Sequence, residues 1–162
     1  KLKDVAEIRQ KLLDEYYRPH HEKLTFLVEN SLHKNGKALI IDCHSFPKFP
    51  LPYELDQKHD RAETCIGTDA FHTPKTLTLY LVELFSEAGF LVEVNRPFSG
   101  ALVPTKFWQL NRSVQSVMIE VRRDLYMDEQ SGLKTDNYTK IRQLLTKLTS
   151  ESKNWQFEFE NN

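Results

Sequence analysis

Several features that would assign the chain to a broad class are missing from its sequence. The 22 basic residues are offset by 23 acidic ones, and no basic run stands out, so a nucleic-acid-binding surface is not expected. No stretch approaches the roughly 18 consecutive apolar residues of a membrane span, and the first residues show no signal-peptide pattern. The two cysteines, Cys43 and Cys65, form no C-x-x-C pair. We therefore expect buried thiols in a cytoplasmic protein, rather than disulfides or thiolate zinc ligands.

The composition is typical of a packed protein. Of the 162 residues, 40% are hydrophobic and 28% are charged, which fits a single domain over residues 1–162 with a polar tail from about 150. Apolar residues at helical spacing predict helices, and continuous apolar runs predict buried strands. The expected helices cover 4–16, 24–35, 74–89 and 138–148, with Pro19 interrupting the first pattern, and the expected strands cover 37–42, 90–95 and 113–123. Residues 45–73, with several prolines and charges, are expected to form a long loop.

The order of these elements predicts the fold class. Helices alternating with strands favour an α/β fold with a mixed, largely parallel sheet between helical layers. In such sheets, ligands bind beyond the carboxyl ends of the strands. Polar residues follow the apolar part of the first strand at 42–45, follow the second at Asn95 and interrupt the third at Glu120. We expect these residues to gather near one edge of the sheet.

His44 is the first candidate for chemistry. It follows the apolar residues of the first expected strand and is flanked by Asp42 and Ser45. An imidazole at a strand end is a possible zinc ligand, which Asp42 or Ser45 would orient by hydrogen bonding. The alternative is a core histidine bonded to the backbone, since a metal site needs several ligands and this segment shows one.

Glu120 is the second candidate, because it interrupts the apolar residues of the third strand. A buried carboxylate is costly unless it is paired, hydrogen-bonded or near a metal. Burial would also raise its pKa, as a general acid or base working near neutral pH requires. The alternative is an ion pair with Arg122, which lies two residues further on the same strand face.

Three further residues are candidates for binding a substrate. Arg112, at the start of the third strand, could bind a substrate carboxylate through two parallel hydrogen bonds, although an exposed arginine is the commoner outcome. Asn95 and Arg123, at the ends of the second and third strands, are candidates for the same role.

Six segments of the sequence together resemble the N-formylglutamate amidohydrolase family. These segments are YYRPHH (16–21), IIDCHS (40–45), CIGTDAFHTP (65–74), VNRPFSG (94–100), MIEVRR (118–123) and LYMDE (125–129). The resemblance implies a fold similar to that of zinc carboxypeptidases and aspartoacylase, and zinc-dependent cleavage of an amide from an amino acid. For the namesake reaction the products would be formate and glutamate. It implies that His44 is a metal ligand, that Glu120 handles protons and that Arg112 holds the substrate carboxylate.

The chain also departs from the family pattern. The family's H-S-G motif, which holds a further ligand histidine, and its D-L-N-R segment do not occur here. The resemblance therefore implies that the chain is the C-terminal portion of a catalytic domain and that the missing N-terminal part supplies the other zinc ligands. We expect the chain alone to bind zinc poorly. Two alternatives stay open: a non-catalytic relative that binds a carboxylate or a partner, and a zinc hydrolase for another N-acyl amino acid or a peptide.

Overall fold

The computed structural model describes residues 6–152 and residue 155. It contains four strands, four α-helices and two short turns of other helical types within this part of the chain. The helices are α1 (Ala6–Leu12), α2 (Arg18–Asn35), α3 (Lys75–Glu87) and α4 (Tyr138–Ser152), with a π-helical turn at Leu13–Tyr17 and a 3₁₀ turn at Arg123–Leu125. The strands are β1 (Ala38–Phe46), β2 (Thr64–Gly67), β3 (Val92–Val94) and β4 (Val114–Arg122). The expected polar tail is helical up to Ser152, and 153–154 and 156–162 lie outside the described residues.

The N-terminal helical segment runs through Pro19, so the expected interruption is wrong. Pro19 lies in the first turn of α2, directly after the π-helical turn at Leu13–Tyr17. A proline is tolerated in the first turn of a helix, where its missing N–H costs least, and a π-turn changes the hydrogen-bond register just before it. α2 ends at Asn35 and is capped by Gly36, whose φ of 69° is the left-handed conformation that glycine adopts without strain.

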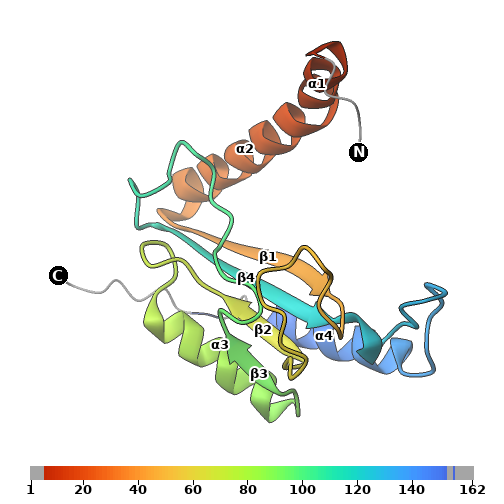
Figure 1. Ribbon diagram of the computed structural model, residues 1–162. Helices are drawn as coiled ribbons and strands as arrows, with labels where there is room; N and C mark the ends of the chain where they lie inside the picture. The colour runs from red at the N-terminus through yellow and green to blue at the C-terminus, as the bar shows by residue number, and fades with distance from the viewer. Residues whose placement is uncertain (1–5, 153–154, 156–162) are drawn as a thin grey trace.

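The sheet has the order β1-β4-β2-β3 (Figure 1). β1 is parallel to β4 and β2 is parallel to β3, whereas β2 is antiparallel to β4. The predicted α/β fold with a mixed, mostly parallel sheet is therefore confirmed. Two details were wrong. β2 lies inside the expected loop, and β1 does not end at Asp42 but continues to Phe46.

The strand directions correct the expected position of Asn95. Because β2 and β3 run opposite to β1 and β4, the carboxyl end of β3 does not lie at the same edge as the carboxyl ends of β1 and β4. Asn95 follows β3 and is thus separated from the edge that holds residues 44–46 and 120–122.

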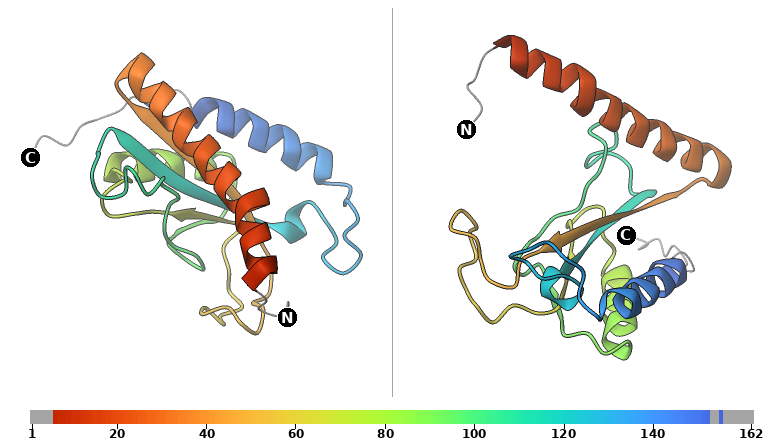
Figure 2. Two further views of the ribbon diagram at one scale, coloured as in Figure 1. Left: turned by 90° about the horizontal axis from the view of Figure 1, so that it is seen from above. Right: turned by 90° about the vertical axis from the view of Figure 1, so that its right-hand side faces the viewer.

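Helices cover both faces of the sheet (Figure 2). On one face, α3 and α4 pack on alternate residues of β4, and the main core contains Leu81, Phe85, Val117, Ile119 and Val121. On the other face, α2 packs near the start of β1 and β4 through a smaller cluster that includes Val28, Ala38 and Val114. None of the described helices is long and apolar enough to cross a membrane. The candidate site lies on this second face, toward the ends of β1 and β4.

Candidate active site at the ends of β1 and β4

His44 and Glu120 are register partners in the parallel pair of β1 and β4. Side chains alternate between the two faces of a strand, and register partners lie on the same face. Val117, Ile119 and Val121 point into the core beneath α3 and α4, so Glu120 points to the opposite face. The strand pattern thus brings an imidazole and a carboxylate, far apart in the sequence, side by side at one level of the sheet.

Asp42 lies on the same face of β1 as His44, two residues earlier. Its Oδ2 is 2.8 Å from His44 Nε2, and the side chains of His44 and Asp42 are 48% and 23% exposed. The carboxylate holds one ring nitrogen and fixes the orientation of the imidazole, leaving Nδ1 for another partner. Ser45 points to the other face of β1 by alternation, so its hydroxyl does not share this site with His44.

Glu120 is only 7% exposed, and its Oε2 is buried without a hydrogen-bond partner among the described residues. Burial raises the pKa of this carboxyl group, as the sequence predicted. The charges of Asp42 and Glu54 raise the pKa further, whereas those of His44 and Arg123 lower it. A buried carboxyl with an unsatisfied oxygen and a raised pKa is suited to exchanging protons with a bound molecule.

The alternative ion pair between Glu120 and Arg122 is not formed. Arg122 Nε donates to Asp124 Oδ1 at 2.7 Å, and its Nη1 donates to the carbonyl of Arg61 at 2.6 Å. Arg122 therefore ties the end of β4 to the segment before β2. Arg123, rather than Arg122, is the arginine whose charge lowers the pKa of Glu120.

The segment between β1 and β2 forms part of the surroundings of Glu120. Arg61, whose side chain is fully buried, forms an ion pair with Glu54. Its guanidinium also donates to the carbonyls of Pro47 at 3.2 Å and Asp56 at 2.8 Å. The segment is folded around this one arginine, which places Glu54 where its charge reaches Glu120. Sequence reasoning missed both residues, because an arginine and a glutamate in a charged loop give no sign of burial.

Arg123 lies at the carboxyl end of β4, close to the site. Its Nε is 3.3 Å from Glu129 Oε1, and its Nη1 donates to the carbonyl of Ser45 at 3.4 Å. Glu129 also accepts a hydrogen bond from the backbone N–H of Lys48 at 3.2 Å. Arg123 thus joins the ends of β1 and β4 and keeps a positive charge beside Glu120.

The structure does not bring Arg112 to this site. Arg112 precedes β4, whereas Glu120 lies near its other end, and the six residue steps from Val114 to Glu120 alone span roughly 20 Å of strand. The guanidinium of Arg112 stacks on the Phe71 ring at 4.2 Å and donates to the Phe71 carbonyl at 3.4 Å. It is therefore too far away to hold a small substrate that is in contact with Glu120.

Asn95 lies outside the candidate site and forms hydrogen bonds with Thr68. Its Oδ1 accepts from the N–H of Thr68 at 2.8 Å, and its Nδ2 donates to Thr68 Oγ1 at 2.7 Å. The residue has a φ of 59°, a conformation in which asparagine is among the better tolerated residues. Asn95 thus fixes the segments that follow β2 and β3 against each other.

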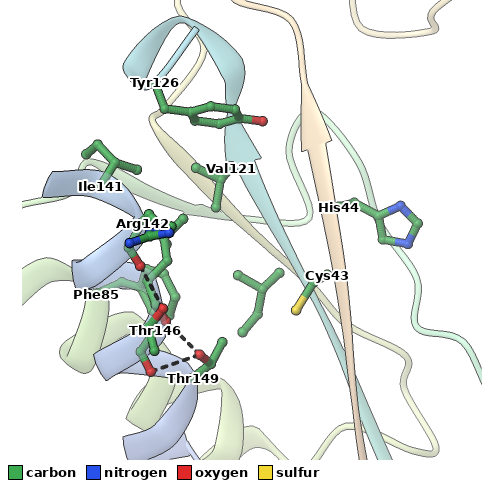
Figure 3. A pocket seen from close by; sticks show the side chains of 11 residues that line it. Cys43, His44, Phe85, Val121, Tyr126, Ile141, Arg142, Thr146 and Thr149 are labelled. Atoms are coloured by element: carbon green, nitrogen blue, oxygen red, sulfur yellow. Dashed lines mark hydrogen bonds between the residues drawn. The ribbon is translucent and has the colours of Figure 1, made fainter. Parts of the chain in front are cut away.

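Cys65 lies beside Glu120 on the neighbouring strand β2, since the two residues are register partners. Its side chain is fully buried, and Sγ lies 3.1 Å from the Phe98 carbonyl. Burial raises the pKa of the thiol. This agrees with the expected role as a buried thiol. Cys43 differs, because it is exposed and points away from His44, toward α4 (Figure 3).

The residues present fit one side of a zinc site. His44 offers a half-exposed imidazole already oriented by a carboxylate, and Glu120 offers an unpartnered carboxylate oxygen beside it. Zinc in a hydrolase needs about three protein ligands and one open position. Within residues 6–152, no three His, Cys, Asp or Glu side chains cluster closely enough to hold a metal ion.

Comparison with known proteins agrees with this arrangement. The sequence model of the N-formylglutamate amidohydrolase family matches residues 2–127. The chain belongs to this family. The match includes β1 with His44 and β4 with Glu120, so the family segments are the ones that build the candidate site.

The solved structures that are similar to this chain include the following two. N-formylglutamate amidohydrolase from Ralstonia eutropha JMP134 has a TM-score of 0.78 and 28% identity, over 93% of this chain and 54% of that one. The gene product Atu2144 from Agrobacterium tumefaciens has a TM-score of 0.65 and 18% identity, over 94% of this chain and 56% of that one, and shows the fold alone. No curated protein matches. The chain thus spans about half the length of the two solved structures.

Proposed function

We propose that this chain forms part of a metal-dependent amidohydrolase that cleaves N-formylglutamate to formate and glutamate. Membership of the N-formylglutamate amidohydrolase family supports the class of reaction. The observation that carries the assignment of residues is the pairing of His44 with the buried Glu120 on one face of the sheet.

In this proposal, Glu120 moves the protons. A carboxyl group with a raised pKa takes a proton from the attacking water and then delivers it to the departing amine. Its burial keeps bulk water away, and its unpartnered Oε2 is available to the reacting molecule. Glu120 is fixed within β4 between two neighbouring strands, so little reorganisation is needed when the proton moves.

His44 would be the metal ligand from this chain, with Asp42 holding the other ring nitrogen. Zinc, when bound, would polarise the scissile carbonyl and increase the acidity of a water. The remaining ligands would come from outside the residues described here, because these contain no cluster of three.

Arg123 replaces Arg112 as the candidate for binding the substrate carboxylate. Its charge already acts on Glu120, and its side chain is 29% exposed at the carboxyl end of β4. A guanidinium forms two parallel hydrogen bonds with a carboxylate, which would orient the amino acid with its acyl group toward Glu120.

The test uses a polypeptide in which this chain is joined to the part of the family domain that it does not span. Formate release from N-formylglutamate is measured for the parent, for Glu120→Gln and for the exposed control Glu87→Gln on α3. We expect Glu120→Gln to lower the rate about 10²–10⁴-fold with zinc still bound, and Glu87→Gln to act as the parent does.

A Glu120→Gln rate of about a tenth of the parent rate or more would exclude Glu120 as the proton carrier. A parent that releases no formate but binds N-formylglutamate would instead identify a non-catalytic relative, and release of other acyl groups would change the substrate.

A further inference from the structure

The segment 96–102, which follows β3, crosses the face of the sheet that carries Glu120. Ser116 and Glu120 share this face, because residues separated by an even number of positions on a strand point the same way. Ser116 Oγ donates to the carbonyl of Leu102 at 2.7 Å. This end of the segment thus lies on β4, on the side of the candidate site.

Gly100 marks the next level along β4. A β-carbon on Gly67 would lie 2.7 Å from the backbone oxygen of Gly100 and would also meet the side chain of Met118, the register partner of Gly67. Met118 lies halfway between Ser116 and Glu120 on β4. Followed backward from residue 102, the segment therefore runs along β4 toward Glu120.

Phe98 lies over β4 at the level of Glu120. Its carbonyl oxygen is 3.1 Å from Sγ of Cys65, the register partner of Glu120 on β2. Its ring centroid is 5.9 Å from that of Phe46, which lies on β1 on the same face as His44. Because β4 is the strand between β1 and β2, a residue that contacts both of these strands on one face crosses over β4.

The ring of Phe98 is also held by a buried cation. The guanidinium carbon of Arg61 lies 5.9 Å from the ring centroid, and a cation over an aromatic face attracts it. Arg61 is itself fixed, since its fully buried side chain pairs with Glu54. Phe98 is therefore packed between Phe46 and Arg61, and its position over β4 accounts for the burial of Glu120, which is 7% exposed.

We propose that Phe98 is a specificity-determining residue, which bounds the space for the acyl group of the substrate and limits it to formyl. The inference rests on the reaction proposed above. In that reaction Glu120 takes the proton of the water that attacks the acyl carbon, so this carbon lies close to Glu120. A formyl carbon carries only a hydrogen, whereas an acetyl carbon carries a methyl group, which would meet the ring of Phe98.

The first experiment measures acyl preference in the joined polypeptide. The ratio of kcat/KM for N-formylglutamate to kcat/KM for N-acetylglutamate is compared in the parent, Phe98→Leu, Phe98→Ala and Phe71→Ala. Phe71 is the matched control, because it is also half-buried and carries a guanidinium, that of Arg112, over its ring. We expect the ratio to fall about tenfold or more in Phe98→Ala, the usual effect of room for one more carbon. Phe98→Leu should fall between, and Phe71→Ala should match the parent.

The second experiment measures how well Phe98 covers Glu120 and needs no turnover. The chain is treated with a water-soluble carbodiimide and glycine ethyl ester, and amide formation at Glu120 is followed by peptide mass spectrometry relative to the exposed Glu87. We expect this relative rate to rise severalfold in Phe98→Ala and to stay at the parent value in Phe71→Ala. Cooperative denaturant unfolding of each variant shows that it is folded.

Two catalytic results would overturn the inference alone: a parent that cleaves N-acetylglutamate as readily as N-formylglutamate, or an unchanged ratio in Phe98→Ala. A joined parent that cleaves neither compound would remove the proposed reaction and the acyl assignment together. The carbodiimide rates are independent of both, and equal modification of Glu120 in the parent and in Phe98→Ala would show that Phe98 does not cover it.

Discussion

Glu120 and His44 lie side by side because β1 and β4 pair in register, and no hydrogen bond joins their side chains in the described structure. Burial raises the pKa of Glu120, and the charge of His44 lowers it through space. The pKa of Glu120 thus depends on the charges of the other residues in the site.

The chain by itself should contain well under one equivalent of zinc. In the proposed site His44 supplies one ligand, and residues 6–152 contain no cluster that would complete a site of about three. Elemental analysis of the purified chain measures the zinc content. The His44→Ala variant of the joined polypeptide provides the comparison, because it should lose zinc that the joined parent retains. Tight one-to-one zinc in the chain alone would contradict the assignment of ligands.

The stability of the chain should depend on pH through Glu120. Its pKa is raised in the folded state, so the folded protein holds this proton more tightly than the unfolded chain does. The resulting stabilisation is complete below the ordinary glutamate pKa and is lost as the pH rises through the raised value. Denaturant unfolding from about pH 4 to 8 should show the free energy of unfolding of the parent falling relative to that of Glu120→Gln. Parallel curves for the two proteins would mean that Glu120 is not perturbed.

Replacing Asp42 by asparagine should lower the pKa of Glu120. The Asp42 carboxylate raises this pKa through its negative charge, and the amide side chain of the variant would keep the shape without the charge. The titration is followed through the carboxyl carbon resonance of Glu120 by NMR. Asp136→Asn, at an exposed position outside the site, is the matched control and should leave the titration unchanged. An unchanged or raised Glu120 pKa in Asp42→Asn would show that the two carboxylates do not interact.

Gly67→Ala should destabilise the fold by about 1–3 kcal/mol, since a β-carbon at this position has no room. It would meet the Met118 side chain and lie 2.7 Å from the backbone oxygen of Gly100. Thermal or denaturant unfolding measures the loss. The double variant Gly67→Ala with Met118→Ala removes the clash with Met118 Cε but keeps the close contacts with Met118 Cβ and with the backbone, so it should not regain the parent stability. A single Gly67→Ala variant as stable as the parent would refute the close packing of β2 on β4.

The sequence was sufficient for the features that depend on local pattern. Apolar runs and helical spacing located α3, α4, β1, β3 and β4, and an acidic residue within an apolar strand identified Glu120 as unusual. The direction of β2 was beyond such reasoning, because its four residues lie in a segment rich in proline and charge. Without that antiparallel strand, all strand ends were expected at one edge, which misplaced Asn95.

The sequence pattern alone also could not predict which residues pair with the buried charges. Arg122 and Arg123 are adjacent in the sequence, yet one pairs with Asp124 and the other acts on Glu120. The family resemblance assigned Arg112 to the substrate carboxylate, but the length of β4 puts this residue at the far end of the strand. Which arginine meets which carboxylate depends on tertiary contacts between segments that no local spacing encodes.

Among the strands that the structure describes, β4 is held by neighbours on both of its sides, and β1 by one. The two halves of the candidate site should therefore come apart unequally. Fraying of the sheet can carry His44 and Asp42 away as one unit while Glu120 stays anchored beside Cys65. The site is then complete only while β1 is paired and the imidazole of His44 is in place. Conditions that loosen this outermost strand would disrupt the site well before the molecule as a whole unfolds.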